Sequence, residues 1–170
     1  MGQLSVTAGS AASTQHVKNL GVPANRIVDY HQPNLQAALL ASNQQRPFDF
    51  VIDLVGGSLS QTCAEVLAIG GTYVDIAFLG TDGTRNELFD KAATIHNVAI
   101  YAYALGNDPI QRARFGRQLT ELAALVQAGA LPAPPVHVLG KFGLETVRQA
   151  HLRLDANQTQ GKLVMTFPEA

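Results

Sequence analysis

The residue types that most often carry catalysis are scattered along this sequence. The glycine-rich phosphate motifs G-x-G-x-x-G and G-x-x-x-x-G-K-[ST] are absent, as are the G-x-S-x-G elbow and a tyrosine followed four residues later by lysine. No two histidines lie four residues apart, whereas zinc needs three or four convergent ligands. We therefore predict no catalytic residue and no metal site. The histidines are His16, His31, His96, His137 and His151.

Two glycine positions are more informative, because each directly follows a strand that reads as buried. Gly56-Gly57 ends the apolar run FDFVIDLV, and Gly80 ends the run TYVDIAFL. In an open parallel sheet, ligands bind beyond the carboxyl ends of the strands, and glycine there lets a ligand approach the backbone. A tight turn between strand and helix needs the same residues. The sequence leaves both interpretations open.

The elements that must position these glycines alternate between strand and helix. LSVTA, RIVDY, FDFVIDLV, TYVDIAFLG and VAIYAYALG read as strands, and amphipathic segments with capping residues separate them. This alternation, from residue 4 to about residue 130, predicts an α/β fold with a parallel sheet and helices on both faces. The last stretch follows the stiff connector LPAPP and reads as strand, helix and strand.

Composition narrows the class of protein. The chain has 170 residues, of which 46% are hydrophobic and 15% charged, and its formal net charge is −1. Such a chain can bury a core, and its charge gives no reason to expect nucleic acid or a membrane as partner. The single cysteine, Cys63, excludes an internal disulfide. The start shows no secretory signal pattern, so we expect a cytoplasmic protein.

Several segments in register resemble one family. The strand ending D-x-V-G-G at residues 53–57, the pattern L-x-x-G-G-x-x-V at 67–74 and the closing QGKLVMTF are similar to the C-terminal part of medium-chain dehydrogenase/reductases. The likeness is to the zinc-free quinone oxidoreductase and enoyl reductase branch of this zinc-binding dehydrogenase-like family. It covers essentially the whole chain.

The resemblance implies which parts of the family's architecture this chain holds. Residues 1–131 correspond to a partial nucleotide-binding, Rossmann-like domain, and residues 132–170 to a segment that completes the family's catalytic domain. The GroES-like domain and the first strand–turn–helix unit have no counterpart here. In the strand order 3-2-1-4-5-6 that first strand is central, so LSVTA and FVIDLV would lie two strand spacings, about 10 Å, apart. We expect that the sheet closes up, that another chain fills the position, or that the N-terminal unit packs poorly.

The resemblance also implies a cofactor. NAD-preferring members carry an acid at the end of the second strand, where this chain has Ala8-Gly9-Ser10, so the expected cofactor is NADP(H). The family's nearby lysine is replaced by Ser13, and Lys18 is the cation that could substitute by reaching along its helix. Tyr30 is either a second phosphate neighbour or a rim aromatic. Without the glycine-rich turn we expect NADP(H) binding to be weak or lost. The expected cofactor-binding residues are Ser10, Tyr30, Val55, Gly56, Phe78, Leu79 and Gly80.

Three functions remain open on this basis. The chain is a fragment or remnant of an NADP(H)-dependent quinone or enone reductase that is inactive alone. Alternatively, it is a homodimeric binding module that pairs through a strand at residues 98–105, because an exposed edge is a pairing template. As a third alternative, it is one subunit of a split reductase, completed by a separate GroES-like chain.

Overall fold

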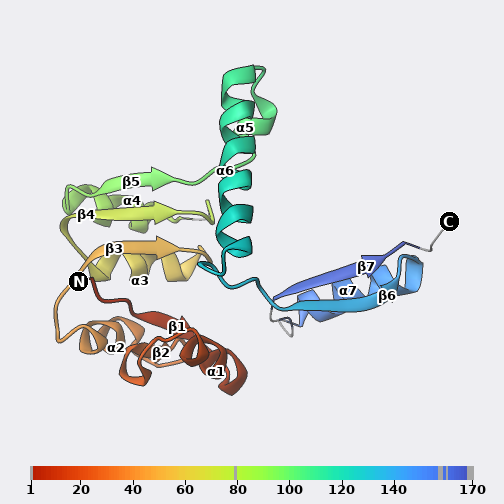
Figure 1. Cartoon of the computed structure of the whole chain (residues 1–170). Helices are drawn as coiled ribbons and strands as arrows, with labels where there is room; N and C mark the ends of the chain where they lie inside the picture. The colour runs from red at the N-terminus through yellow and green to blue at the C-terminus, as the bar shows by residue number, and fades with distance from the viewer. Residues whose placement is uncertain (1, 79, 157–158, 160, 168–170) are drawn as a thin grey trace. The chain divides into compact units, whose positions relative to one another are not determined.

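The computed structural model describes residues 2–78, 80–156, 159 and 161–167. The chain forms two compact units, Met1–Ala102 and Tyr103–Ala170 (Figure 1). This division falls before the long helix α6, Pro109–Gln127, whereas the predicted domain boundary at residue 131 falls after it. The predicted boundary refers to the family's domains and stays a prediction.

The first unit begins with a pair of short parallel strands. Strand β1 (Val6–Ala8) pairs with β2 (Ile27–Asp29), with Val6 opposite Ile27 and Ala8 opposite Asp29. Between them lie helix α1 (Ala11–Asn19) and a 3-10 turn, Ala24–Arg26. Helix α2 (Leu35–Ser42), capped by Asn34, leads on to the next strand.

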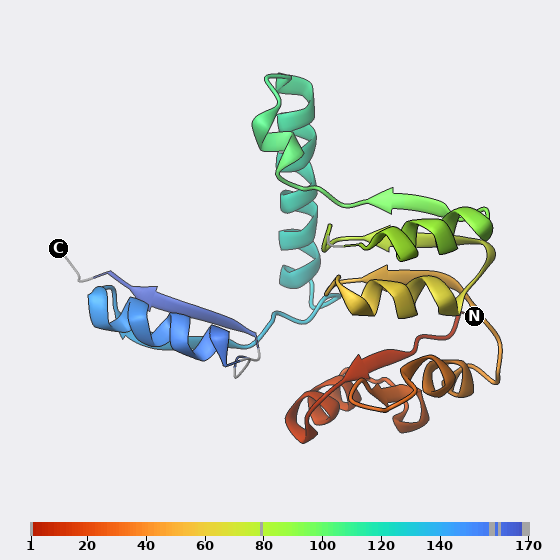
Figure 2. The ribbon, with the colours of Figure 1, turned by 180° about the vertical axis from the view of Figure 1, so that it is seen from behind.

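A three-stranded parallel sheet follows, in the order β3-β4-β5. Helices α3 and α4 connect these strands, and Ala64, Leu67, Tyr73 and Leu88 form its buried core. Figures 1 and 2 show both helices on the same face of this sheet. The bounds are β3 Phe48–Asp53, α3 Ser58–Val66, β4 Leu67–Asp75, α4 Asp82–Asp90 and β5 Thr94–Asn97.

The predicted α/β fold is confirmed, but two predicted element boundaries are wrong. The sequence predicts a helix over residues 60–69 that ends at Gly70-Gly71, but strand β4 already begins at Leu67. The pairing of β4 with β3 shifts register there, from Phe48↔Leu67 to Phe50↔Thr72. Gly70, with φ +72°, sits inside this irregularity. The glycines therefore mark a bulge rather than a helix end.

The predicted strand at 98–105 is also wrong. The strand lies earlier, at Thr94–Asn97, and residues 102–105 are helical in α5 (Ala102–Leu105). The sequence predicts a helix over residues 85–97, but helix α4 ends at Asp90. Ala92, just beyond this end, takes a positive φ of 49°. Homodimer formation stays a prediction, and the edge available for it in the described part of the sheet is that of β5.

A lysine fixes the end of α4 against the end of α3. The ammonium of Lys91 donates to the carbonyl oxygens of Ala64, Glu65 and Leu67 at 2.9, 2.6 and 3.0 Å. It also pairs with Glu87 at 3.1 Å. The Ala64 and Glu65 carbonyls lie at the C-terminus of α3, where few backbone donors remain; the Ala64 carbonyl also accepts from the Leu67 amide, and the Leu67 carbonyl belongs to β4. Lys91 therefore supplies a hydrogen-bond donor to three part-buried carbonyl oxygens.

Replacing Lys91 by methionine should destabilise the first unit. The Lys91→Met variant keeps the aliphatic stem but removes every donor, so we expect a loss of about 2 kcal/mol in the free energy of unfolding. Urea titration followed by circular dichroism measures it. Lys162→Met, at an exposed position of the second unit, is the matched control. Equal stability of the two variants would contradict this role for Lys91.

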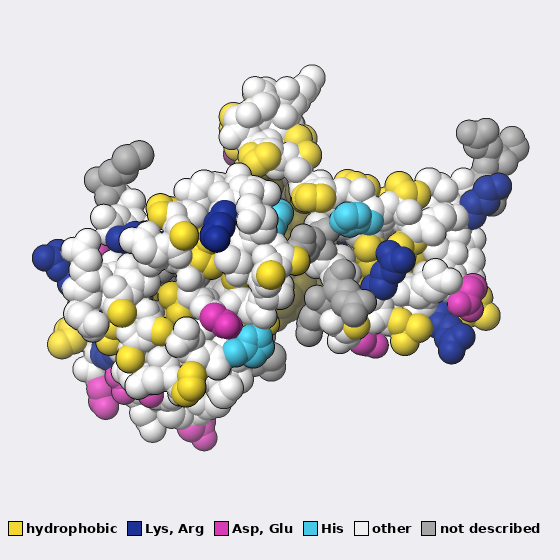
Figure 3. Space-filling model, turned by 90° about the horizontal axis from the view of Figure 1, so that it is seen from below, with side chains coloured by type: hydrophobic (Ala, Val, Ile, Leu, Met, Phe, Trp, Pro, Cys, Tyr) yellow, Lys and Arg dark blue, Asp and Glu magenta, His cyan; other side chains and the backbone are white. Residues whose placement is uncertain are grey.

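The second unit contains α6 and a strand–helix–strand segment. Strand β6 (Val136–Lys141) pairs in parallel with β7 (Lys162–Thr166), and helix α7 (Leu144–Asp155) connects them. The predicted closing segment is therefore confirmed. Among the described residues no helix has the length and apolar character needed to cross a bilayer. On the face shown in Figure 3, lysine and arginine side chains are separated by uncharged surface.

Candidate functional site

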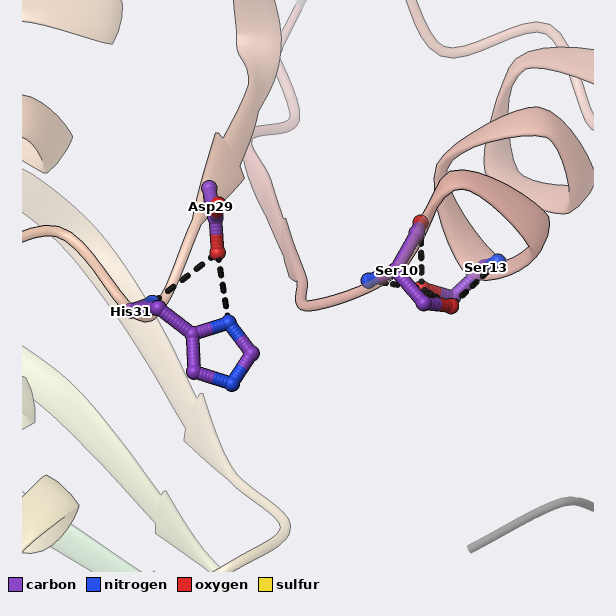
Figure 4. Close-up of polar contacts among 4 residues, drawn as sticks. All are labelled: Ser10, Ser13, Asp29 and His31. Atoms are coloured by element: carbon purple, nitrogen blue, oxygen red, sulfur yellow. Dashed lines mark hydrogen bonds and ion pairs between the residues drawn. The ribbon is translucent and has the colours of Figure 1, made fainter.

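The first group of candidate residues lies where β1 ends and α1 begins. The Ser10 hydroxyl accepts a hydrogen bond from the Ser13 amide at 3.0 Å, and the Ser13 hydroxyl accepts one from the Ser10 amide at 3.0 Å (Figure 4). This is a reciprocal capping box, which satisfies amides at the helix N-terminus. Both hydroxyls are exposed, so Ser10 presents a neutral polar group at the carboxyl end of its strand.

The second strand of the pair brings an aromatic ring and an imidazole to the same place. The Tyr30 ring lies against Gly9 so closely that a side chain at position 9 would collide with it. The ring centroids of Tyr30 and His31 are 4.4 Å apart. Tyr30 therefore lies beside Gly9, directly before Ser10, and a larger residue at position 9 would have to displace its ring.

An exposed carboxylate orients His31. Asp29 accepts hydrogen bonds from the His31 amide and from the ring nitrogen Nδ1, both at 2.9 Å. The backbone hydrogen bond from His31, followed by the side-chain one, lowers the pKa of Asp29. Figure 4 shows the other ring nitrogen turned away from Asp29, where it is available to an outside ligand. Lys18, the expected substitute cation, lies in the last turn of α1, at the end away from Ser10.

The turn after β3 is built on one buried carboxylate. Asp53, 2% exposed, accepts from the amides of Val55 and Gly56 through one oxygen, at 2.9 and 2.8 Å. Its other oxygen accepts from the hydroxyls of Ser60 and Tyr73, each at 2.6 Å. One side chain thus joins the strand, its turn, α3 and β4. Gly56 and Gly57 have φ values of 79° and 63°, a region that favours glycine.

This network shifts the pKa values of its members in opposite directions. Burial raises the pKa of Asp53, but the hydrogen bonds from Ser60, Tyr73 and the two amides together outweigh it, so the net shift is downward. Burial, together with the Asp53 carboxylate, raises the pKa of Tyr73. Asp53 is therefore charged and Tyr73 neutral at physiological pH, which is the pairing that the short hydrogen bond requires.

Replacing Asp53 by asparagine should destabilise the chain and flatten its response to acid. An amide cannot accept four hydrogen bonds as a carboxylate does, so we expect a loss of about 2–3 kcal/mol at neutral pH. A lowered pKa means stability that is present above the unfolded value of about 3.9 and is lost as pH falls through the folded value. Unfolding curves below about pH 4 should therefore fall less steeply for Asp53→Asn than for the wild type.

The matched control is Asp49→Asn, because Asp49 is an exposed aspartate on the same strand. It should change neither the stability at neutral pH nor the acid response by more than about 0.5 kcal/mol. Parallel acid responses of the wild type and Asp53→Asn would contradict the assignment.

The third group lines a cleft beyond β4. Asp75 accepts a hydrogen bond from the Phe78 amide at 2.7 Å, which holds the loop in a turn where Phe78 has a φ of 53°. Phe78 and Gly80 line a cleft of about 290 Å³ together with Arg85 and Asn97. The cleft is therefore bordered by an exposed cation, a side-chain amide and an exposed aromatic ring.

The predicted cofactor-binding residues fall at three places. Ser10 and Tyr30 lie together at the ends of β1 and β2, Val55 and Gly56 form the turn after β3, and Phe78 and Gly80 lie beyond β4. Leu79 lies outside the described residues. Their role in binding a cofactor stays a prediction.

The sequence analysis missed three side chains that shape these places: Asp29, Asp53 and His31. For Asp29 and Asp53 a local signal was available. An aspartate side chain commonly accepts a hydrogen bond from the backbone amide two or three residues later and so stabilises a turn. The contact of Asp53 with Tyr73 spans twenty residues and had no such signal.

A comparison with known protein families places this chain in one of them. The sequence model of the family described as "Zinc-binding dehydrogenase" matches residues 22–165, which is most of the chain. This chain belongs to that family. The predicted resemblance is therefore confirmed.

Two relatives indicate which kinds of protein contain this segment. A highly reducing polyketide synthase of Aspergillus terreus is 32% identical over 154 residues, which cover 89% of this chain and 6% of the synthase. The trans-enoyl reductase poxH of Penicillium oxalicum is 25% identical over 176 residues, which cover 99% of this chain and 44% of the reductase. This member of the zinc-binding dehydrogenase family thus spans less than half the length of either relative.

Solved structures share its fold. The CurF ER cyclopropanase from the curacin A biosynthetic pathway superposes with a TM-score of 0.77 at 18% identity, covering 98% of this chain and 47% of that one. CurA of Vibrio vulnificus, solved in complex with NADPH, gives a TM-score of 0.71 at 18% identity, covering 97% and 50%. These superpositions confirm the Rossmann-like fold.

The family's name raises the question of zinc. Among the described residues, no three His, Cys, Asp or Glu side chains lie close enough together to hold a metal ion. Burial, with the nearby charge of Asp53, raises the pKa of the Cys63 thiol to about 12, so it stays protonated. Zinc binds the thiolate. The donor set that the structure describes does not fit zinc, and no zinc-dependent step follows from it.

Proposed function

We propose that this chain supplies the nucleotide-binding half of an NADP(H)-dependent enoyl or quinone reductase. The observation that carries the proposal is the position of Ser10 and the Val55-Gly56 turn, directly beyond the ends of β1 and β3, with Gly80 in the loop that follows β4. Ligands of such sheets bind at that edge. When bound, NADP(H) supplies the hydride, and the protein supplies binding and orientation.

The residues present fit an NADP(H) nucleotide better than NAD(H). Ser10 is neutral at the place where NAD-binding proteins of this fold carry an acid. The open space beside Gly57 leaves its backbone accessible to a ligand. His31 donates its Nδ1–H to Asp29, so its outward-facing ring nitrogen accepts in the neutral ring and donates to a phosphate only when the imidazole is protonated. The relative CurA, which was solved with NADPH, supports the same cofactor class.

Binding of nucleotide fragments tests this proposal, with 2′,5′-ADP and 5′-AMP as probes. We expect 2′,5′-ADP to bind about tenfold more tightly, because only it carries the second phosphate. The Ser10→Asp variant should remove this preference, since a carboxylate repels the phosphate. Ser10→Asn is the control, because asparagine and aspartate cap helices equally well and only the charge differs. Equal binding of both probes to the wild type by calorimetry would contradict the proposal.

Catalysis needs more than these residues. No described side chain at the strand ends is placed as an acid or nucleophile toward a substrate. We expect residues 1–170 alone to bind the full cofactor weakly and to reduce neither a quinone nor an enone. The measurement is loss of NADPH absorbance at 340 nm with menadione or an enoyl thioester. Turnover by the purified chain would refute the inactivity, while leaving the cofactor assignment intact.

A further inference from the structure

The carboxyl ends of β1 and β2 bring a hydroxyl and an imidazole to the same edge of the fold. Ser10 follows β1 and His31 follows β2, each two residues beyond the last pair of the ladder (Figure 4). Between the ladder and these two residues, the Tyr30 ring lies against Gly9, which holds the two segments close together. His31 therefore lies at the edge where ligands of a parallel sheet bind.

The contact with Asp29 fixes which ring nitrogen of His31 carries a proton. A carboxylate only accepts hydrogen bonds, so Nδ1, which lies 2.9 Å from an Asp29 oxygen, is the donor. The other ring nitrogen, Nε2, points away from Asp29 (Figure 4). In the neutral ring Nε2 is an acceptor and offers no hydrogen to a phosphate, whereas in the protonated ring it is a charged donor. The proton on Nε2 thus decides how His31 meets an anion.

The net charge at this edge depends on the same proton. Strand β2 packs against β1 and α2, and neither of these elements has an ionisable side chain. Helix α1, which packs against β1, has no acid, and its His16 and Lys18 lie in its last turn rather than at its start. The titratable groups that contact His31 within the described residues are Asp29 and the Tyr30 ring. The pair of Asp29 and His31 therefore carries one negative charge when the imidazole is neutral and no net charge when it is protonated.

The imidazole is not needed to hold the turn in which it lies. The His31 backbone amide already donates to Asp29 at 2.9 Å, and any residue at position 31 except proline can make this bond. The His31 side chain is 62% exposed, so its packing contributes little to stability. The ring therefore has the exposure and the orientation of a group that meets a ligand.

We propose that protonated His31 is the residue that recognises the adenosine phosphate of NADP(H) in this chain, so that the preference for NADP(H) over NAD(H) depends on pH. This inference rests on the proposed nucleotide site and adds the group that supplies its charge. A charged donor binds a phosphate about twice as strongly as a neutral one. Histidine side chains change charge between about pH 5 and 8. The preference is therefore greatest in the acidic part of this range and is lost as the pH rises, because the neutral ring leaves the Asp29 carboxylate to repel the phosphate.

The pH dependence of fragment binding to the full chain tests this inference, again with 2′,5′-ADP and 5′-AMP as probes. Phosphate itself gains a proton near about pH 6, so each affinity is compared with that of the His31→Gln variant at the same pH, which cancels the titration of the ligand. We expect the ratio of wild-type to His31→Gln affinity for 2′,5′-ADP to fall by about fivefold or more between about pH 6 and pH 8. The same ratio for 5′-AMP should stay constant. Calorimetry measures both.

Two matched variants and one spectroscopic signal separate recognition from a structural role. His31→Arg keeps a cation at every pH, so its preference for 2′,5′-ADP should be the same at both pH values. His96→Gln, which removes an exposed histidine of β5, should behave as the wild type. In an NMR titration, 2′,5′-ADP should move the midpoint of the His31 ring to higher pH and leave that of His96 unchanged, because the proton and the phosphate favour each other's binding reciprocally.

The outcomes distinguish this inference from the proposed function. Equal or undetectable binding of both probes to the wild type at both pH values contradicts the proposed function and this inference with it. A preference for 2′,5′-ADP that His31→Gln leaves with the same pH dependence overturns this inference alone. An NMR midpoint of the His31 ring that 2′,5′-ADP does not move, although it binds, also overturns this inference alone.

Discussion

The carboxylate of Asp53 is the interaction on which the ligand edge of this chain depends. It lies at the end of a parallel strand, and its four hydrogen bonds reach the following turn, the start of α3 and the side of β4. Without it, the two glycines at positive φ would have little to hold them in one conformation, because glycine loses the most backbone entropy on ordering. The conformation of the turn at Val55-Gly56, in which Val55 is exposed and Gly56 is buried, is thus a consequence of one buried charge that is fully paired.

A second constraint is the hydrogen-bonding requirement of parallel strands. Each strand must pair or be covered, and the chain meets this requirement for β4, which has partners on both sides. It does not meet it for β1 and β3, whose facing edges are unmatched. Of the three outcomes weighed from the sequence, closure of the sheet is not what the structure has, since β1 pairs only with β2.

These two constraints together connect the fold to the family's chemistry. Membership in the zinc-binding dehydrogenase family rests on residues 22–165, and the solved relatives are about twice as long as this chain. The strand-end residues described here are neutral or carry a single paired charge, which suits recognition of a nucleotide better than acid–base catalysis.

The sequence by itself determined the α/β class, most element positions and the neutral residue at the end of β1. These follow from local rules: apolar periodicity, capping residues at helix starts and glycines at turns. It misplaced the last strand of the sheet, because Val98 and Ile100 have as much strand propensity as Thr94 and Ile95, and only pairing with β4 selects Thr94–Asn97. The grouping of Asp53 with Tyr73, the contact of Tyr30 with Gly9 and the separation of β1 from β3 were decided by tertiary structure. Each of them joins residues far apart in sequence, and their energies depend on burial and on unpaired backbone groups that no local pattern encodes.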